Sequence, residues 1–150
     1  MSAVGLEGID HAVQQAHIWI NDVEKRMGWN NKARAYRLLK TVLHALRDHL
    51  PVNEAVDLGA QLPMLIRGVY YDQWRPATTP VKDRHLESFL ATIDKAFRDD
   101  PLDDTAEAAA AVFSLLSDRI SAGEIADVRQ ELPAQLRLLW PAAREGKVPA

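Results

Sequence analysis

Apolar side chains recur at intervals of three and four along most of the chain, which is the spacing of one face of an α-helix. The first stripe runs through Ile9, Val13, Ala16, Ile20, Val23 and Met27. Gly28 follows that stripe in the position of a C′ residue, and Asn30 or Asn31 can cap a second helix over about 32–50. The pattern therefore predicts two long amphipathic helices in the first third of the chain.

Two shorter helices are predicted next, one over 52–60 after Pro51 and one over 63–74 with Pro63 in its first turn. Capping boxes beginning at Asp104 and Ser121 mark the start of two more helices in the second half. We find no run of alternating apolar and polar residues long enough for a strand. The fold class predicted from these patterns is all-α.

The second half of the chain resembles the first at an offset of 70 residues. Eight of the 36 positions from Ala35 to Tyr70 are identical to their partners, where chance would give roughly two. The pattern predicts a bundle of about eight helices, built as two tandem, pseudo-symmetric four-helix repeats. We place repeat 1 at residues 1–74, a Pro-containing linker at 75–82 and repeat 2 at 83–145, packed with repeat 1 as one globular unit.

Composition limits the class of protein. Apolar residues make up 47% and charged residues 26% of the chain, the balance of an ordinary soluble globular protein. A net charge of −3 argues against a wholly basic nucleic-acid binder, and the absence of cysteine excludes disulfides, thiol nucleophiles and cysteine metal sites. Neither a secretory signal nor a transmembrane segment is evident, so we expect a cytoplasmic protein.

Several segments resemble one known family. They are Leu62–Pro76, Leu46–Gln61, Lys82–Ala91 and Arg119–Trp140. Together they resemble the bacterial DUF2267 family, in its longer two-repeat form, from about Ile9 to Trp140. The resemblance implies a cytoplasmic, helical protein of bacterial type. It brings no activity and no catalytic motif, because the family has no assigned function.

Charges that recur in both repeats are expected to serve the fold. Asp48 and Asp118 lie in the last turn of a helix, where the macrodipole disfavours a negative charge. Arg67 and Arg137 are the repeated cations, so we predict the ion pairs Asp48–Arg67 and Asp118–Arg137. An acid–base pair in a site is the alternative. The repeated Glu54 and Glu124 are predicted to be helix-capping residues.

Charges present in one half only are candidates for a specific task. A basic stripe is expected on the second helix, formed by Arg34, Arg37, Lys40, His44 and Arg47. It is our candidate surface for a partner or an anion. It could equally be a solvated face, or pair with the acidic segment 99–104. Nothing resembling a helix-turn-helix or an aromatic–basic pattern favours nucleic acid.

Two further groups of residues are candidates for a site. His44 and Asp48 share a helix face, but no HExxH or Glu-x-x-His pattern supports a metal, and we predict no metal or cofactor. Tyr71 and Trp74 are specific to the first half. If exposed, they would form an aromatic patch for a protein partner; if buried, they would pack the linker against repeat 2.

No nucleophile, phosphate-binding or dinucleotide motif is present, so an enzyme is not expected. The first hypothesis is a non-enzymatic interaction or adaptor protein whose partner is a protein, including a second copy of itself in a homodimer, and not nucleic acid or a membrane. The alternative is a protein that binds a small ligand or anion, even an unrecognised enzyme, in a pocket between the repeats near His44 and Arg67.

Overall fold

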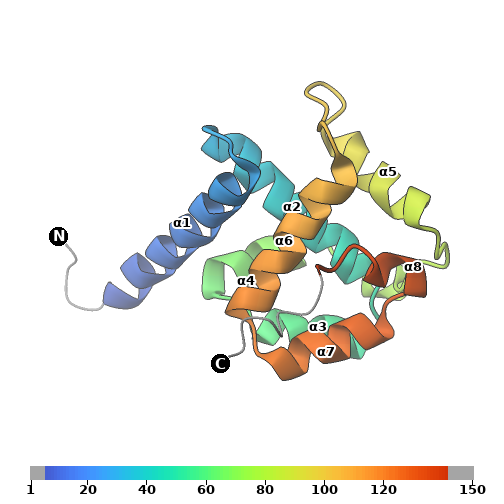
Figure 1. Ribbon diagram of the computed structural model, residues 1–150. Coiled ribbons are helices and arrows are strands. Elements are labelled where there is room, and N and C mark those ends of the chain that lie inside the picture. The colour runs from blue at the N-terminus through green and yellow to red at the C-terminus, as the bar shows by residue number, and fades with distance from the viewer. Residues whose placement is uncertain (1–5, 142–150) are drawn as a thin grey trace, which may run out of the picture.

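The computed structural model describes residues 6–141, and within that range every regular element is a helix. The all-α prediction is confirmed. The elements are α1 (Glu7–Met27), α2 (Lys32–Asp48), α3 (Val52–Ala60), α4 (Met64–Tyr71), a 3-10 turn η1 (Pro76–Thr78), α5 (Leu86–Ala96), α6 (Thr105–Arg119), α7 (Ala122–Glu131) and α8 (Ala134–Arg137) (Figure 1). No helix of this part of the chain is long and apolar enough to cross a membrane.

The helix ends follow the local signals in the sequence. Gly28 ends α1 in the left-handed conformation (φ 69°), and the N–H of Trp29 bonds back to the Glu24 carbonyl oxygen at 2.9 Å. Asn31 caps α2 through its side chain, which accepts from the Arg34 N–H at 3.0 Å. Asp104 and Ser121 cap α6 and α7 in the same way. The predicted caps are therefore confirmed.

The core lies where α2 and α6 cross (Figure 1). Helix α2 buries an almost continuous apolar face, and α6 supplies the opposing one, which contains Val112, Phe113, Leu115 and Leu116. The Phe113 ring stacks on Trp140, with centroids 4.3 Å apart, and so joins α6 to the segment after α8. Burial of these side chains is the main force that holds the helices together.

Within the described residues, the main contacts between the predicted halves join four pairs of helices. Helix α1 packs on α6, α2 on α5, α2 on α6, and α3 on α7. This set is compatible with a two-fold relation between α1–α4 and α5–α8. It does not test the repeat boundaries, so the two-repeat arrangement and the linker at 75–82 stay predictions. The linker region is anchored at one point, where the Val81 N–H bonds to the Asp48 carbonyl oxygen at 2.8 Å.

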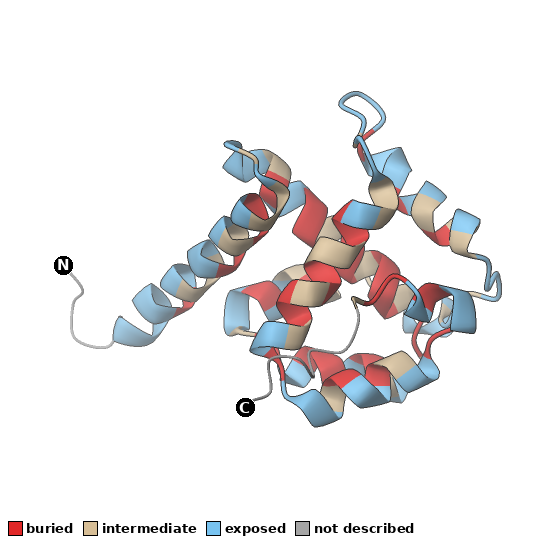
Figure 2. Cartoon of the chain, in the orientation of Figure 1, coloured by how far each residue is buried: buried red, intermediate tan, exposed pale blue. Residues whose placement is uncertain are grey.

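Helix α1 is covered along only part of its length. Its C-terminal half buries Trp19 and Val23, whereas residues 6–11 are exposed on all sides and point away from the other helices (Figures 1 and 2). The apolar stripe of α1 therefore extends beyond the part of the helix that other helices cover. Ile9 is 56% exposed and Val13 41% exposed, and Leu6, two turns before Val13 on nearly the same line, is 48% exposed. We call Leu6, Ile9 and Val13 the α1 stripe.

Candidate functional site

Arg47 of the predicted basic stripe is a buried structural residue. Its side chain is 4% exposed. Its Nη1 donates to the carbonyl oxygens of Tyr70 at 2.7 Å and Asp72 at 3.0 Å, and its Nε donates to Asp48 Oδ1 at 2.9 Å. The guanidinium thus satisfies carbonyls at the C-terminal end of α4 and favourably opposes the dipole there. Arg47 cannot contribute to a docking surface, and the prediction is wrong for it.

Two other members of the stripe are also engaged within the chain. Arg34 stacks over the Trp29 ring and pairs through Nε with Asp100 Oδ2 at 2.8 Å. For Arg34, the prediction that the basic stripe pairs with the acidic segment 99–104 is therefore confirmed. The half-buried His44 bonds through Nε2 to the Val69 carbonyl oxygen at 2.6 Å. Partial burial lowers the pKa of His44, which the bond to Val69 only partly opposes.

Arg37 and Lys40 are the two members of the predicted basic stripe that form no hydrogen bond or ion pair described above. Arg37 is exposed, with its guanidinium 5.5 Å from the centre of the Phe97 ring, and Lys40 is half-buried. Two neighbouring cations are a common feature of solvated helix surfaces and do not by themselves define a site. The sequence pattern correctly put five basic residues on α2, but it could not show that most of them contact other parts of the chain.

The aromatic patch is only half-exposed. The Tyr71 ring stacks on Trp74, with centroids 5.5 Å apart, and lies 5.1 Å from the Tyr70 ring. Both Tyr71 and Trp74 pack against the core, and the Trp74 Nε1 is buried without a hydrogen-bond partner. This arrangement is closer to the buried alternative than to an exposed hot spot.

The predicted ion pairs of Arg67 and Arg137 are not formed. Arg67 donates through Nε to the Gly59 carbonyl oxygen at 3.0 Å and through Nη2 to that of Leu62 at 2.8 Å. Arg137 donates in a similar way to the carbonyl oxygens of Leu132 and Gln130. Both arginines therefore cap the helix that precedes their own, α3 and α7. The expectation of a structural role is supported, but helix carbonyls, not carboxylates, are the acceptors.

The two aspartates pair with other arginines. Asp48 accepts from its neighbour Arg47. Asp118 accepts from Arg26 Nη2 at 2.6 Å, and Arg26 also binds Asp22 through Nε at 2.7 Å. These contacts connect α1 to α6. Burial alone would raise the pKa of Asp22, but hydrogen bonds from Arg26 and Arg119 hold it below its ordinary value.

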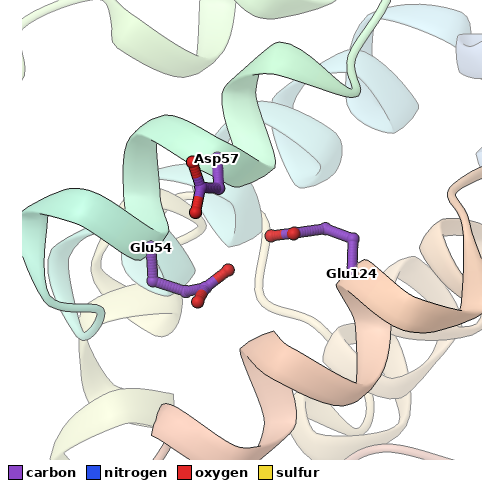
Figure 3. Close-up of side chains that lie close together, drawn as sticks. All are labelled: Glu54, Asp57 and Glu124. Carbon is purple, nitrogen blue, oxygen red and sulfur yellow. The ribbon is translucent and has the colours of Figure 1, made fainter.

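A cluster of carboxylates lies between α3 and α7 (Figure 3). Glu54 and Asp57 come from α3 and Glu124 from α7, and one carboxylate oxygen of each lies within 4.8 Å of the others. Glu54 Oε2 and Glu124 Oε2 are both buried without a donor from the protein. The predicted capping roles are therefore incomplete. Ser121 does cap the Glu124 N–H, but the Glu124 carboxyl lies against Glu54.

Like charges this close cannot all remain ionised in a partly buried site. Burial, a hydrogen bond to Glu54 and the negative charges of Glu54, Asp57 and Asp127 raise the pKa of Glu124 to about 8. A proton held by the Glu124 carboxyl relieves the repulsion. Carboxylate oxygens are also the donors that Ca²⁺ and Mg²⁺ prefer, so within residues 6–141 this cluster is the group that could hold a divalent cation. The sequence carries a signal for this cluster, because Glu54, Glu124 and Asp57 all belong to the identities repeated at an offset of 70 residues.

Glu124→Gln is expected to remove a pH dependence of stability. Because the pKa of about 8 in the folded chain exceeds the ordinary 4.5, the folded state holds this proton more tightly than the unfolded state. The resulting stabilisation is complete below pH 4.5 and is lost as pH rises through 8. For a partly exposed, screened group the loss is about 1–2 kcal/mol.

The measurement is the free energy of unfolding in urea at about pH 5.5 and about pH 9. Between these pH values the free energy of unfolding of wild type should fall relative to that of Glu124→Gln. Glu131→Gln, which replaces an exposed carboxyl elsewhere on α7, should show the same fall as wild type. Equal slopes in wild type and Glu124→Gln would contradict the proton held by the Glu124 carboxyl. His44 and His49, whose pKa values burial lowers, act in the opposite direction below pH 6.5 and affect all variants alike.

An open depression of about 400 Å³ lies between α1, the α3–α4 turn and the end of α6. Arg67, Asp118 and Arg119 line it together with Gln15 and Trp19. Arg67 is bound to helix carbonyls, and Arg119 to Asp22 at 2.9 Å. His44, which the sequence placed at a pocket between the repeats, does not line this one.

The fold and the side-chain contacts together define a class: an all-α protein in which most of the candidate site cations bind the chain's own carbonyl and carboxylate oxygens. The family model described as "Uncharacterized conserved protein (DUF2267)" matches residues 16–139. The chain therefore belongs to the DUF2267 family, as its resemblance implied. No curated protein matches the chain.

Proposed function

We propose that this protein is a non-enzymatic, cytoplasmic interaction module of bacterial type, and that it binds a protein partner through the α1 stripe. The observation that carries this proposal is the exposure of Leu6, Ile9 and Val13 on a helix end that projects from the molecule. Contiguous apolar side chains on a soluble protein favour a binding role, since water makes their exposure unfavourable.

The position of the α1 stripe supports a binding role more than a packing role. Ile20 and Met27 continue the same stripe and pack against the core, so the helix face is built for burial along its whole length. The N-terminal half presents that face where no described helix covers it (Figure 2). A single exposed apolar residue such as Ile18, on the other side of α1, needs no such explanation.

The ligand-binding alternative has weaker support. The depression beside Arg67 is large enough for a small molecule, but its two arginines already bind helix carbonyls and Asp22. An anion would have to compete with those bonds and with Asp118, another lining residue. For this reason we place the protein-interaction proposal first.

Photo-crosslinking tests the proposed function. The full chain is produced in a bacterial host with p-benzoylphenylalanine at position 13, or at position 18 as the matched control on the opposite side of α1. We expect irradiation to give a discrete crosslinked protein from position 13 and none from position 18, and we expect Ile9→Ser to abolish it. Crosslinks of equal yield from both positions, or none from position 13, would contradict the proposal.

A further inference from the structure

The projecting half of α1 carries charges of one sign only. Between Leu6 and Asn21 the only Asp, Glu, Lys or Arg residues are Glu7 and Asp10, and Lys25 is the first cation of the helix. Asp10 is exposed and lies three residues before Val13 and four after Leu6. Residues at these spacings share a helix face, so a negative charge borders the α1 stripe directly.

Resting on the proposed function, we infer that the partner contributes an amphipathic α-helix whose apolar side chains are flanked by Lys or Arg. The apolar side chains would pack on Leu6, Ile9 and Val13, as amphipathic helices pack in other recognition modes. Basic flanks would then face Asp10. Charge complementarity of this kind sets the choice of partner and the rate of association more than it sets the affinity.

A second copy of this chain fits the α1 stripe less well. An isologous contact places the same patch on both sides, so it would bring two copies of the exposed Asp10 into one interface. Three half-exposed side chains are also far below the roughly 800 Å² per partner that a stable interface buries. A basic amphipathic helix that binds with modest affinity agrees both with the acidic border of the α1 stripe and with its small exposed area.

Two synthetic peptides provide the test. Both are helical and carry the same Leu/Ile stripe; one has Lys flanks and the other Glu flanks. Fluorescence anisotropy with the full chain is expected to give about tenfold or tighter binding of the Lys peptide over the Glu peptide. Val13→Ser should abolish binding of the Lys peptide, while Ile18→Ser should leave it unchanged.

Charge reversal tests the choice of partner separately from the stripe. Asp10→Lys should remove the preference for the Lys peptide, whereas Asp99→Lys, which makes the same change in net charge at an exposed loop position, should retain most of it. Circular dichroism of each variant checks that it folds.

The outcomes distinguish the inference from the proposed function. Equal binding of both peptides, abolished by Val13→Ser, would overturn the basic partner but leave the α1 stripe as an interaction surface. Binding of neither peptide would also overturn the inference, and the crosslink from position 13 would still decide the proposed function. A dimer in sedimentation that Val13→Ser converts to a monomer would assign the stripe to a second copy and overturn the inference.

Discussion

Arg47→Met is expected to lower the free energy of unfolding by about 3 kcal/mol, because a buried group that bonds two helix carbonyls and a carboxylate is lost. Methionine fills a similar volume but donates no hydrogen bond. The carbonyl oxygens of Tyr70 and Asp72 would then lack their donor, and Asp48 would lose its cation. For a domain of this size the change corresponds to a fall in Tm of about 6–12 °C.

Arg37→Met is the matched control for this prediction. Arg37 is on the same helix and belonged to the same predicted basic stripe, but it is exposed. Its replacement is expected to change stability by no more than about 0.5 kcal/mol. If thermal and urea unfolding gave similar small losses for both variants, Arg47 would not have the structural role described here.

Gly59→Ala is expected to destabilise the protein by about 2 kcal/mol, although alanine is the better helix former. A Cβ added at Gly59, in α3, would lie 2.2 Å from Tyr71 Oη and 2.6 Å from Tyr71 Cζ. Contacts with the Tyr70 and Trp74 rings hinder movement of the Tyr71 ring. The overlap therefore outweighs the gain of about 1 kcal/mol in helix propensity.

Gly68→Ala supplies the control, because Gly68 lies in α4 and an added Cβ there meets no atom within 4 Å. It should stabilise the protein by about 0.5–1 kcal/mol. In a Tyr71→Ala background, Gly59→Ala should also become neutral or stabilising. Urea unfolding of the four variants measures these differences. A stabilising Gly59→Ala in the wild-type background would show that Tyr71 does not occupy this position.

Sequence patterns predicted the fold well because helical periodicity and caps are local. The prediction for α4 still ran three residues too far, to Trp74, whereas the helix ends at Tyr71. The chain leaves the helical conformation at Asp72 (φ −57°, ψ 129°), and Gln73 then adopts a left-handed conformation (φ 64°) that its residue type does not indicate. The second helix likewise ends at Asp48 instead of near residue 50.

The candidate sites were harder to predict because they depend on which segments meet. Periodicity placed Arg47 on the basic stripe, but its burial depends on the end of α4, 23 residues away. The repeat analysis singled out Arg67 and Glu124 as structural positions. It could not show that Arg67 faces helix carbonyls or that Glu124 meets Glu54. The α1 stripe was visible in the sequence, but periodicity alone does not show where the covering helices end.

Exposure of the α1 stripe in solution is the claim on which the proposed function rests, and thiol labelling measures it directly. The chain has no cysteine, so single cysteines can be placed at positions 9 and 13, with Ile18→Cys as the exposed reference and Val23→Cys as the buried one. We predict that cysteines at 9 and 13 react with Ellman's reagent at nearly the rate of Ile18→Cys. Protection as strong as that of Val23→Cys would mean that the stripe is already covered, and would contradict the account.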